Sequence, residues 1–135
     1  MKSLLLDANV LSELFRANPE VQARLRKVSR IVISPVVEGE IVGGFRAGSR
    51  TEKNLEIWSR FLSEPFVDRV PLGSESADRY ARIWAQLRSK GTPIPSNDMW
   101  IAAQAGELGV ELLSFDHHFQ HVDGLVWTHL QGLTD

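Results

Sequence analysis

The sequence contains no cysteine and no apolar run near the roughly 20 residues that a membrane-spanning helix needs. Without cysteine, the chain has neither a disulfide framework nor a thiolate metal site, which fits a reducing compartment. The apolar stretch close to the N-terminus, Leu4–Leu6, is too short for a secretory signal peptide. We therefore expect a cytoplasmic protein that has no membrane segment.

The chain also lacks a large excess of charge of either sign. Its formal net charge of −2 argues against bulk electrostatic binding to nucleic acid, which is typical of strongly basic domains. Nucleic acid is not excluded, because local arginines, a bound cation or a partner could offset an acidic site. Internal repeats, low-complexity tracts and linkers are absent as well, and 135 residues suit one domain, which we place at residues 1–135.

Short apolar runs alternate with segments of helical periodicity. Runs at residues 4–6, 31–33 and 111–114 are typical of buried strands, and residues 67–70 and 125–127 predict shorter ones. Between them lie helical patterns that start or stop at proline, glycine or capping residues. This alternation predicts an α/β fold, with a central parallel sheet flanked by helices.

Several polar residues stand where they could cap these helices. Asp7 or Asn9 is placed to cap the first helix, and Asn18 precedes Pro19 at the start of the second. We expect Thr51 to cap a later helix. We expect Ser96 or Asn97 to cap the helix over residues 98–108.

Acidic residues follow the apolar runs at corresponding places. Three carboxylates come shortly after predicted strands and a fourth opens a helix: Asp7, Glu40, Asp116 and Asp98. The carboxyl ends of parallel strands lie along one edge of a sheet, where open α/β folds place their ligands. We therefore expect the four carboxylates to converge at this edge.

Such a cluster has a definite chemistry. Mg²⁺ and Mn²⁺ prefer oxygen ligands, whereas zinc sites use cysteine or regularly spaced histidine. Two carboxylates about 5 Å apart repel each other by roughly 3 kcal/mol at an effective dielectric of 20, so the cluster needs a metal or shared protons. A metal held there can polarise a phosphoryl oxygen and activate water, which suits phosphodiester hydrolysis.

Each acidic residue also has a simpler interpretation. Asp7 and Asp98 could each serve only as a helix cap, while Glu40 could be a solvated helix residue and Asp116 a turn residue. Glu38 competes with Glu40, because residues two positions apart on a helix point to nearly opposite sides. Periodicity alone does not choose between them.

Four segments carry a family resemblance: residues 4–14, 34–44, 97–105 and 112–119. They resemble, in order, the four motifs of the PIN-domain ribonucleases, and specifically of the VapC-type toxins of bacterial toxin–antitoxin pairs. In the second segment the match falls on Glu40, since an apolar residue follows it and Gly44 lies four positions on. The third segment, around Asp98, is the most specific. The chain departs from the pattern at His118, where the family often has an acid, and at Ala8, where it often has Thr or Ser.

The resemblance implies a PIN-like fold and a function. Asp7, Glu40, Asp98 and Asp116 would bind Mg²⁺ or Mn²⁺, and a metal-activated water would cleave RNA endonucleolytically. It also implies a cognate antitoxin and a homodimer. In the family a groove among the early helices receives the antitoxin's C-terminal segment. The helical stripe of Trp58, Phe61 and Leu62 favours a place in the core. The aromatic and apolar residues that we consider for the groove as an alternative are Phe15, Phe45, Trp58, Phe61 and Leu62.

Two other functions compete with this interpretation. The chain could be a catalytically silent protein-interaction module in which the acids are helix caps. It could also be a phosphatase for small molecules, although Asp7-Ala8-Asn9 lacks the second acid of an Asp-x-Asp nucleophile. We expect His117, His118 and His121 to be surface residues near a turn, because their spacing matches no regular zinc motif. His118 could instead tune the site or contact a phosphate, since it lies near Asp116. Ser114 either ends a strand or bonds to a carboxylate of the site.

Overall fold

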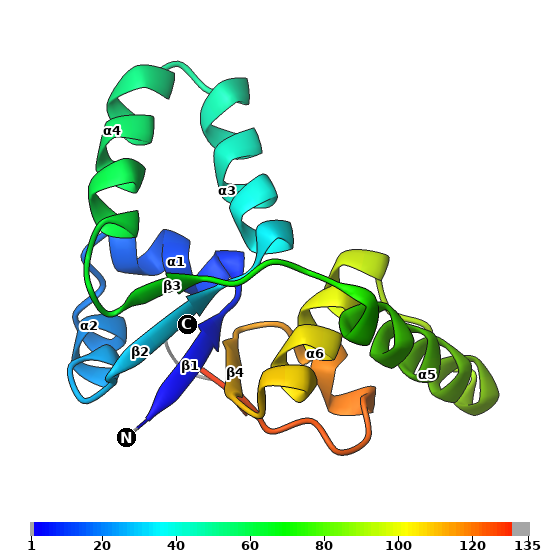
Figure 1. Ribbon diagram of the computed structural model, residues 1–135. Helices are drawn as coiled ribbons and strands as arrows, with labels where there is room; N and C mark the ends of the chain where they lie inside the picture. Colours follow the sequence, from blue (N-terminus) through cyan, green and yellow to red (C-terminus); the bar gives the residue numbers. More distant parts are fainter. Residues whose placement is uncertain (1, 131–135) are drawn as a thin grey trace.

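The computed structural model describes residues 2–130, whose centre is a five-stranded sheet with the strand order β3-β2-β1-β4-β5 (Figure 1). All neighbouring strands pair in parallel. The strands are β1 (Ser3–Leu6), β2 (Arg30–Ile33), β3 (Val67–Arg69), β4 (Glu111–Ser114) and β5 (Trp127–His129). The predicted α/β fold with a central parallel sheet is confirmed.

Helices connect these strands and flank the sheet. They are α1 (Ala8–Phe15), α2 (Pro19–Leu25), α3 (Pro35–Ala47), α4 (Thr51–Leu62), α5 (Ser74–Lys90), α6 (Ser96–Leu108) and the 3₁₀ helix η1 (His117–His121). In Figure 1, α3 and α4 rise side by side beyond the ends of the strands, and α5 packs along α6 on the other side of the molecule. No helix within residues 2–130 is long and apolar enough to cross a membrane.

The three central strands form the middle of the core. Leu4, Leu5, Leu6, Leu112 and Leu113 are fully buried. Strands buried on both faces are typical of parallel sheets covered by helices. The Asp7 backbone N–H continues the pairing by donating to the Leu113 carbonyl at 3.0 Å, so the first acid stands where β1 ends beside β4.

Helix ends agree with several of the predicted caps. Asp7 caps α1 by accepting a hydrogen bond from the Ala8 backbone, and Asn18 caps α2. Gly91 and Gly109 follow α5 and α6 with φ of 70° and 65°, a left-handed conformation that glycine adopts without the penalty of a Cβ.

Three local predictions are wrong in detail. No side chain caps α6, which follows Pro95 and begins at Ser96, and Asn97 bonds to Glu40 instead. Thr51 does not cap α4, because its hydroxyl donates to the Phe45 carbonyl at 2.7 Å. The last strand spans Trp127–His129 rather than residues 125–127. A partner distant in the chain decides two of these outcomes, since Asn97 bonds to Glu40 and pairing with β4 sets the register of β5.

Candidate functional site

Asp7 is a buried carboxylate at the carboxyl end of β1. Only 5% of the residue is exposed. Its Oδ1 accepts a hydrogen bond from the Ala8 backbone N–H at 2.8 Å, and its Oδ2 accepts one from the Ser114 hydroxyl at 2.7 Å. These two bonds fix the orientation of the carboxylate.

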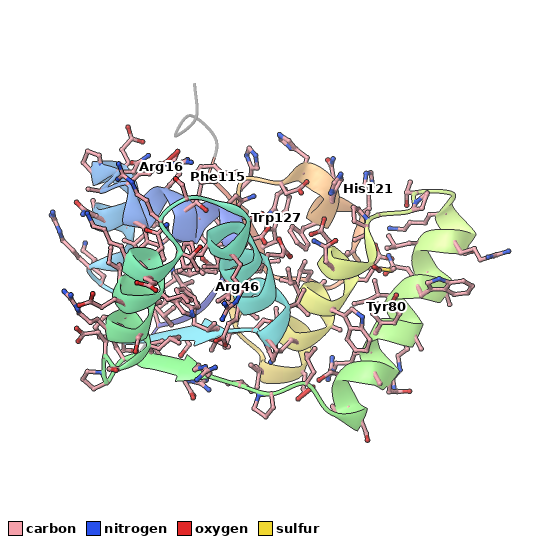
Figure 2. All side chains as sticks on the ribbon, turned by 90° about the horizontal axis from the view of Figure 1, so that it is seen from above. Arg16, Arg46, Tyr80, Phe115, His121 and Trp127 are labelled. Atoms are coloured by element: carbon pink, nitrogen blue, oxygen red, sulfur yellow. The ribbon has the colours of Figure 1, made fainter. Side chains whose placement is uncertain are left out.

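Ser114 joins the ends of β1 and β4. Besides donating to Asp7, its Oγ accepts a hydrogen bond from the Asp116 backbone N–H at 2.9 Å. Asn9 adds a second link, because its Oδ1 accepts from the Phe115 backbone at 3.3 Å. Both interpretations of Ser114 are confirmed, because it ends β4 and also bonds to a carboxylate of the site. Phe115, the residue after Ser114, is labelled in Figure 2, which views the molecule from above.

Asp98 and Asp116 meet at one imidazole. Asp98 lies in the first turn of α6 and is 4% exposed, whereas Asp116 precedes η1 and is partly exposed. The Nδ1 atom of His118 lies 2.8 Å from Asp98 Oδ2 and 2.9 Å from Asp116 Oδ1. His118 is exposed near a turn, as expected, and its contacts with Asp98 and Asp116 also agree with the other interpretation, in which it tunes the site. Its position in the fourth motif, where an acid is usual, was the signal for its place in the site.

Glu40 lies on the exposed side of α3 and reaches across to α6. Its Oε1 accepts a hydrogen bond from the Asn97 side chain at 3.0 Å, a contact that the sequence did not predict. Glu38 turns away and accepts two hydrogen bonds from Arg69, at 3.1 and 2.7 Å. The structure thus places Glu40, and not Glu38, beside the other acids.

The crowding of these groups changes their protonation. Burial raises the pKa of Asp7 to about 6, partly opposed by the hydrogen bonds from Ser114 and Ala8 and reinforced by the charges of Asp98 and Glu40. Burial also raises the pKa of Asp98, although the hydrogen bond with His118 opposes the shift. The pKa of His118 is raised, mainly by its hydrogen bond to Asp98.

The donor set fits a divalent cation. One ligand atom each from Asp98, Asp116 and His118 lie within 4.8 Å of one another. Two of the four carboxylates, Asp7 and Asp98, are buried with raised pKa values, because burial disfavours their ionised forms. A divalent cation would supply compensating positive charge, because it favours the ionised form of every carboxylate around it.

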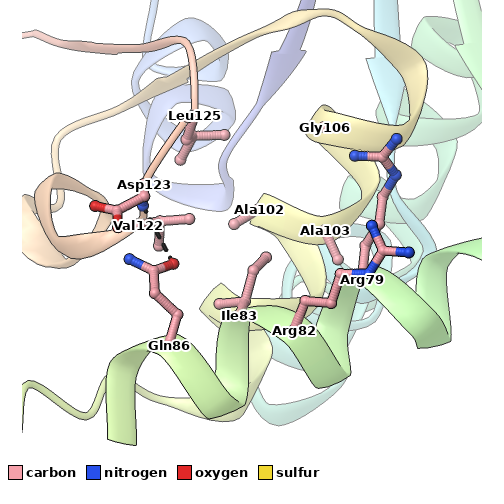
Figure 3. A pocket seen from close by; sticks show the side chains of 11 residues that line it. Arg79, Arg82, Ile83, Gln86, Ala102, Ala103, Gly106, Val122, Asp123 and Leu125 are labelled. Atoms are coloured by element: carbon pink, nitrogen blue, oxygen red, sulfur yellow. Dashed lines mark hydrogen bonds between the residues drawn. The ribbon is translucent and has the colours of Figure 1, made fainter. Parts of the chain in front are cut away.

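The pocket drawn in Figure 3 lies elsewhere. It has a volume of about 190 Å³ and is enclosed by α5, α6 and residues 122–125. Arg79, Arg82 and Gln86 contribute side chains from α5, and the Gln86 amide oxygen accepts from the Asp123 backbone at 3.3 Å. None of the four predicted site acids lines this pocket. This cavity is therefore separate from the group of acids.

A separate apolar groove opens among α1, α2, α4 and the start of β3. Its volume is about 460 Å³, and its lining includes Phe15, Leu25, Phe61 and Phe66. Trp58 does not line it, since this residue is only 3% exposed and packs against Phe15 and Phe61 at centroid distances of 5.9 and 5.6 Å. Phe45 and Leu62 are also outside the lining. Of the five residues considered for the groove, two belong to it.

Comparison with known proteins agrees with this architecture. The sequence model of the protein family described as PIN domain matches residues 4–125 of this chain. The chain is 27% identical over 128 residues to the tRNA(fMet)-specific endonuclease VapC of Salmonella typhimurium, which covers 93% of this chain and 96% of the relative. It is also 27% identical over 131 residues to ribonuclease VapC1 of Haemophilus influenzae, which covers 91% of this chain and 94% of the relative.

Solved structures show the same fold. DNA-bound VapBC from Salmonella typhimurium has a TM-score of 0.85 at 24% identity and covers 96% of this chain and 98% of its own. FitAcB from Neisseria gonorrhoeae has a TM-score of 0.79 at 25% identity and covers 93% of this chain and 96% of its own. Because the family model extends over nearly all of the described residues, this chain belongs to the PIN domain family.

Proposed function

We propose that the protein is a Mg²⁺- or Mn²⁺-dependent endoribonuclease and the toxin of a toxin–antitoxin pair. One observation carries this proposal: in a PIN domain, Asp7 and Asp116 follow the ends of β1 and β4, Asp98 lies in the first turn of α6, and Ser114 and His118 link the three acids. Relatives that align over nearly their whole length are named ribonuclease or endonuclease VapC, which supports RNA as the substrate.

The cation would be held by Asp7, Glu40, Asp98 and Asp116, directly or through water. When bound, it supplies Lewis-acid polarisation of a phosphoryl oxygen and lowers the pKa of a coordinated water. The geometry suits this role, because the acids come from four separate elements and are oriented by hydrogen bonds before any ligand arrives.

The other residues of the site have positioning roles. Ser114 fixes Asp7, and Asn97 fixes Glu40. Because the pKa of Asp7 is about 6, this carboxylate is mostly ionised at neutral pH and remains available as a ligand. Bonds that hold ligating carboxylates in place usually change metal affinity or activity by about 10- to 100-fold when they are removed.

RNA also needs contacts for its phosphates. Two arginines of α5 are already engaged, because Arg82 pairs with Asp78 and Arg88 lies over the Trp84 ring. Arg46 and Arg50 are exposed at the junction of α3 and α4, and neither forms a salt bridge within residues 2–130. Cationic side chains that are not already paired can neutralise phosphates and release counterions. We therefore propose Arg46 and Arg50 as contacts for the RNA backbone.

The proposed partner is an antitoxin whose apolar segment occupies the groove lined by Phe15, Phe61 and Phe66. Another solved structure with this fold, from Mycobacterium tuberculosis, is described as a member of the VapBC family of toxin–antitoxin systems, which supports a protein partner of this kind. An amphipathic helix binds such a groove through its apolar face. Arg26 and Arg60 lie on the rim, where they would favour an acidic flank on the partner. The homodimer implied by the family resemblance is part of the same proposal.

A substrate comparison tests the proposal. Purified full-length protein is incubated with a structured RNA and, separately, with a small phosphate monoester, each with Mg²⁺, with Mn²⁺ and with EDTA. We expect metal-dependent cleavage of RNA and no turnover of the ester. Turnover of the ester alone would favour the phosphatase, and folded, metal-loaded protein that cleaves neither would favour the interaction module.

A further inference from the structure

The proposed function leaves His118 without a role in the chemistry of the site. We propose that the His118 imidazole is a nitrogen ligand of the bound cation, and that it shifts the selectivity of the site from Mg²⁺ toward first-row transition ions such as Mn²⁺. This inference rests on the proposed function, since it concerns the cation of the same site.

The position of the imidazole supports ligation. His118 Nδ1 lies 2.8 Å from Asp98 Oδ2 and 2.9 Å from Asp116 Oδ1, and these three donor atoms lie within 4.8 Å of one another. One cation can therefore contact all three after small side-chain movements. The same nitrogen carries at most one proton, so it cannot donate fully to both carboxylates at once.

The ring is also held in place by its own backbone. The His118 N–H donates to Asp116 Oδ1 at 3.0 Å in the cap of η1, which sets the start of that helix beside α6. About half of the His118 side chain, 46%, is exposed, whereas the Asp98 side chain is 6% exposed. The imidazole thus lies between the buried acid and solvent, on the side from which a cation arrives.

A nitrogen ligand changes which cation the site prefers. Mg²⁺ takes oxygen ligands in near-octahedral geometry and gives up its waters reluctantly. Imidazole suits transition ions, whose affinity for a mixed nitrogen and oxygen site rises from Mn²⁺ through Fe²⁺ and Co²⁺ to Ni²⁺. We therefore expect affinity to increase from Mg²⁺ to Mn²⁺ and again from Mn²⁺ to Ni²⁺.

A simpler role for His118 is a charged hydrogen-bond partner that offsets the two aspartates. That role predicts competition between the imidazole and any cation, so replacing His118 by aspartate would strengthen the binding of Mg²⁺ and Mn²⁺ alike. Nitrogen ligation predicts that the same replacement tightens Mg²⁺ binding while it removes the preference for Mn²⁺. The two roles therefore differ in selectivity and in the atoms bound to the metal.

The experiment measures both properties on metal-free full-length protein. Calorimetry gives dissociation constants for Mg²⁺, Mn²⁺ and Ni²⁺ in wild type, His118→Asp and His117→Asp. His117 is an exposed neighbour whose ring packs against that of His129 at a centroid distance of 4.0 Å, so His117→Asp makes the same substitution one residue away. We expect the ratio of Mg²⁺ to Mn²⁺ dissociation constants to fall about tenfold or more in His118→Asp and to stay unchanged in His117→Asp.

Pulsed electron paramagnetic resonance of the Mn²⁺-loaded protein reports ligation directly. We expect ¹⁴N coupling from a coordinated imidazole in wild type and in His117→Asp, and none in His118→Asp. If His118→Asp does not fold, His118→Gln replaces it, and the wild-type spectrum still gives a decisive answer. Absence of ¹⁴N coupling in wild type, an unchanged selectivity ratio in the variant, or no metal binding by wild type would each overturn the inference.

The outcome is separable from that of the proposed function. EDTA-sensitive cleavage of RNA without ¹⁴N coupling would leave the endoribonuclease standing and remove the nitrogen ligand. Nitrogen coupling in a protein that cleaves no RNA would support the nitrogen ligand and contradict the endoribonuclease.

Discussion

The Ser114 hydroxyl donates a 2.7 Å hydrogen bond to Asp7 Oδ2, a buried contact between residues 107 positions apart in the chain. It connects the end of β4 to the end of β1, the two central strands of the sheet. The same oxygen accepts from the Asp116 backbone, so one serine orients two of the four acids. Predictions about the site begin with this residue.

Removing the hydroxyl should cost both stability and function. Ser114→Ala leaves the Asp7 carboxylate and the Asp116 N–H without their partner, and an unsatisfied buried polar group costs about 1–3 kcal/mol. We expect the free energy of unfolding to fall by that amount and metal affinity to fall about tenfold. Urea denaturation and calorimetry measure the two effects. Ser114→Thr keeps the hydroxyl and serves as the control, and equal losses in both variants would contradict the account.

The raised pKa of Asp7 makes the metal-free protein less stable as pH rises. The folded protein holds the Asp7 proton up to about pH 6, whereas the unfolded chain releases it near the ordinary value of 3.8. Between these values the native state binds more protons than the unfolded chain, so the free energy of unfolding falls as the pH rises. This loss is complete above about pH 6. The raised pKa of Asp98 acts in the same direction.

Asp7→Asn isolates this effect. In EDTA at pH 7.5 the variant should be more stable than wild type, by up to about 3 kcal/mol. At pH 4 the difference should be close to zero, because wild-type Asp7 is then largely protonated. Urea denaturation at the two pH values gives the comparison. If the difference in unfolding free energy between variant and wild type is the same at both pH values, burial does not raise the pKa of the Asp7 carboxyl.

Glu38 and Glu40 should have opposite roles although they lie two residues apart. Glu40→Gln should lower metal affinity and RNA cleavage about 10- to 100-fold with little change in stability, because Glu40 is exposed beside the other acids. Glu38→Gln weakens an ion pair with the exposed Arg69, so it should cost at most about 1 kcal/mol and leave cleavage intact. Parallel kinetics and denaturation test the pair. Loss of cleavage in the Glu38 variant alone would reverse the assignment.

The groove should bind the antitoxin without taking part in cleavage. Phe66 is 42% exposed and lines the groove, so Phe66→Asp should weaken antitoxin binding by tenfold or more while RNA cleavage persists. Trp84→Asp is a matched control, since Trp84 is 47% exposed on α5, outside the groove. Binding of the antitoxin's C-terminal peptide can be followed by calorimetry. Equal affinity for wild type and the Phe66 variant would place the partner elsewhere.

Much of the fold follows from local sequence patterns. The runs of β1, β2 and β4 are continuous and apolar because both faces of these strands are buried, and such runs are readily recognised. Asp7 and Asp116 stand directly beyond two of these runs, so their place at the sheet edge also follows. Gly91 and Gly109 mark helix ends through their left-handed conformation.

The remaining details depend on contacts between distant segments. Asn97 is a suitable helix cap by itself, but its amide bonds to Glu40 on another helix. Arg69 donates a hydrogen bond to Glu38, and it is Glu40 that lies beside the other acids. His118 meets Asp98 across 20 positions. Periodicity along one element contains no information about such partners.

The most direct test of the central claim is cleavage of total cellular RNA by purified, antitoxin-free protein, with the cut ends mapped by sequencing. Wild type is compared with Asp7→Ala, Asp98→Ala and the exposed distant control Asp123→Ala, each with Mn²⁺, with Mg²⁺ and with EDTA. We expect wild type and Asp123→Ala to cut the RNA at the same discrete positions. These cuts should vanish in EDTA and in both site variants. Folded, metal-loaded wild type that leaves all RNA intact, or cuts that persist in Asp98→Ala, would contradict it.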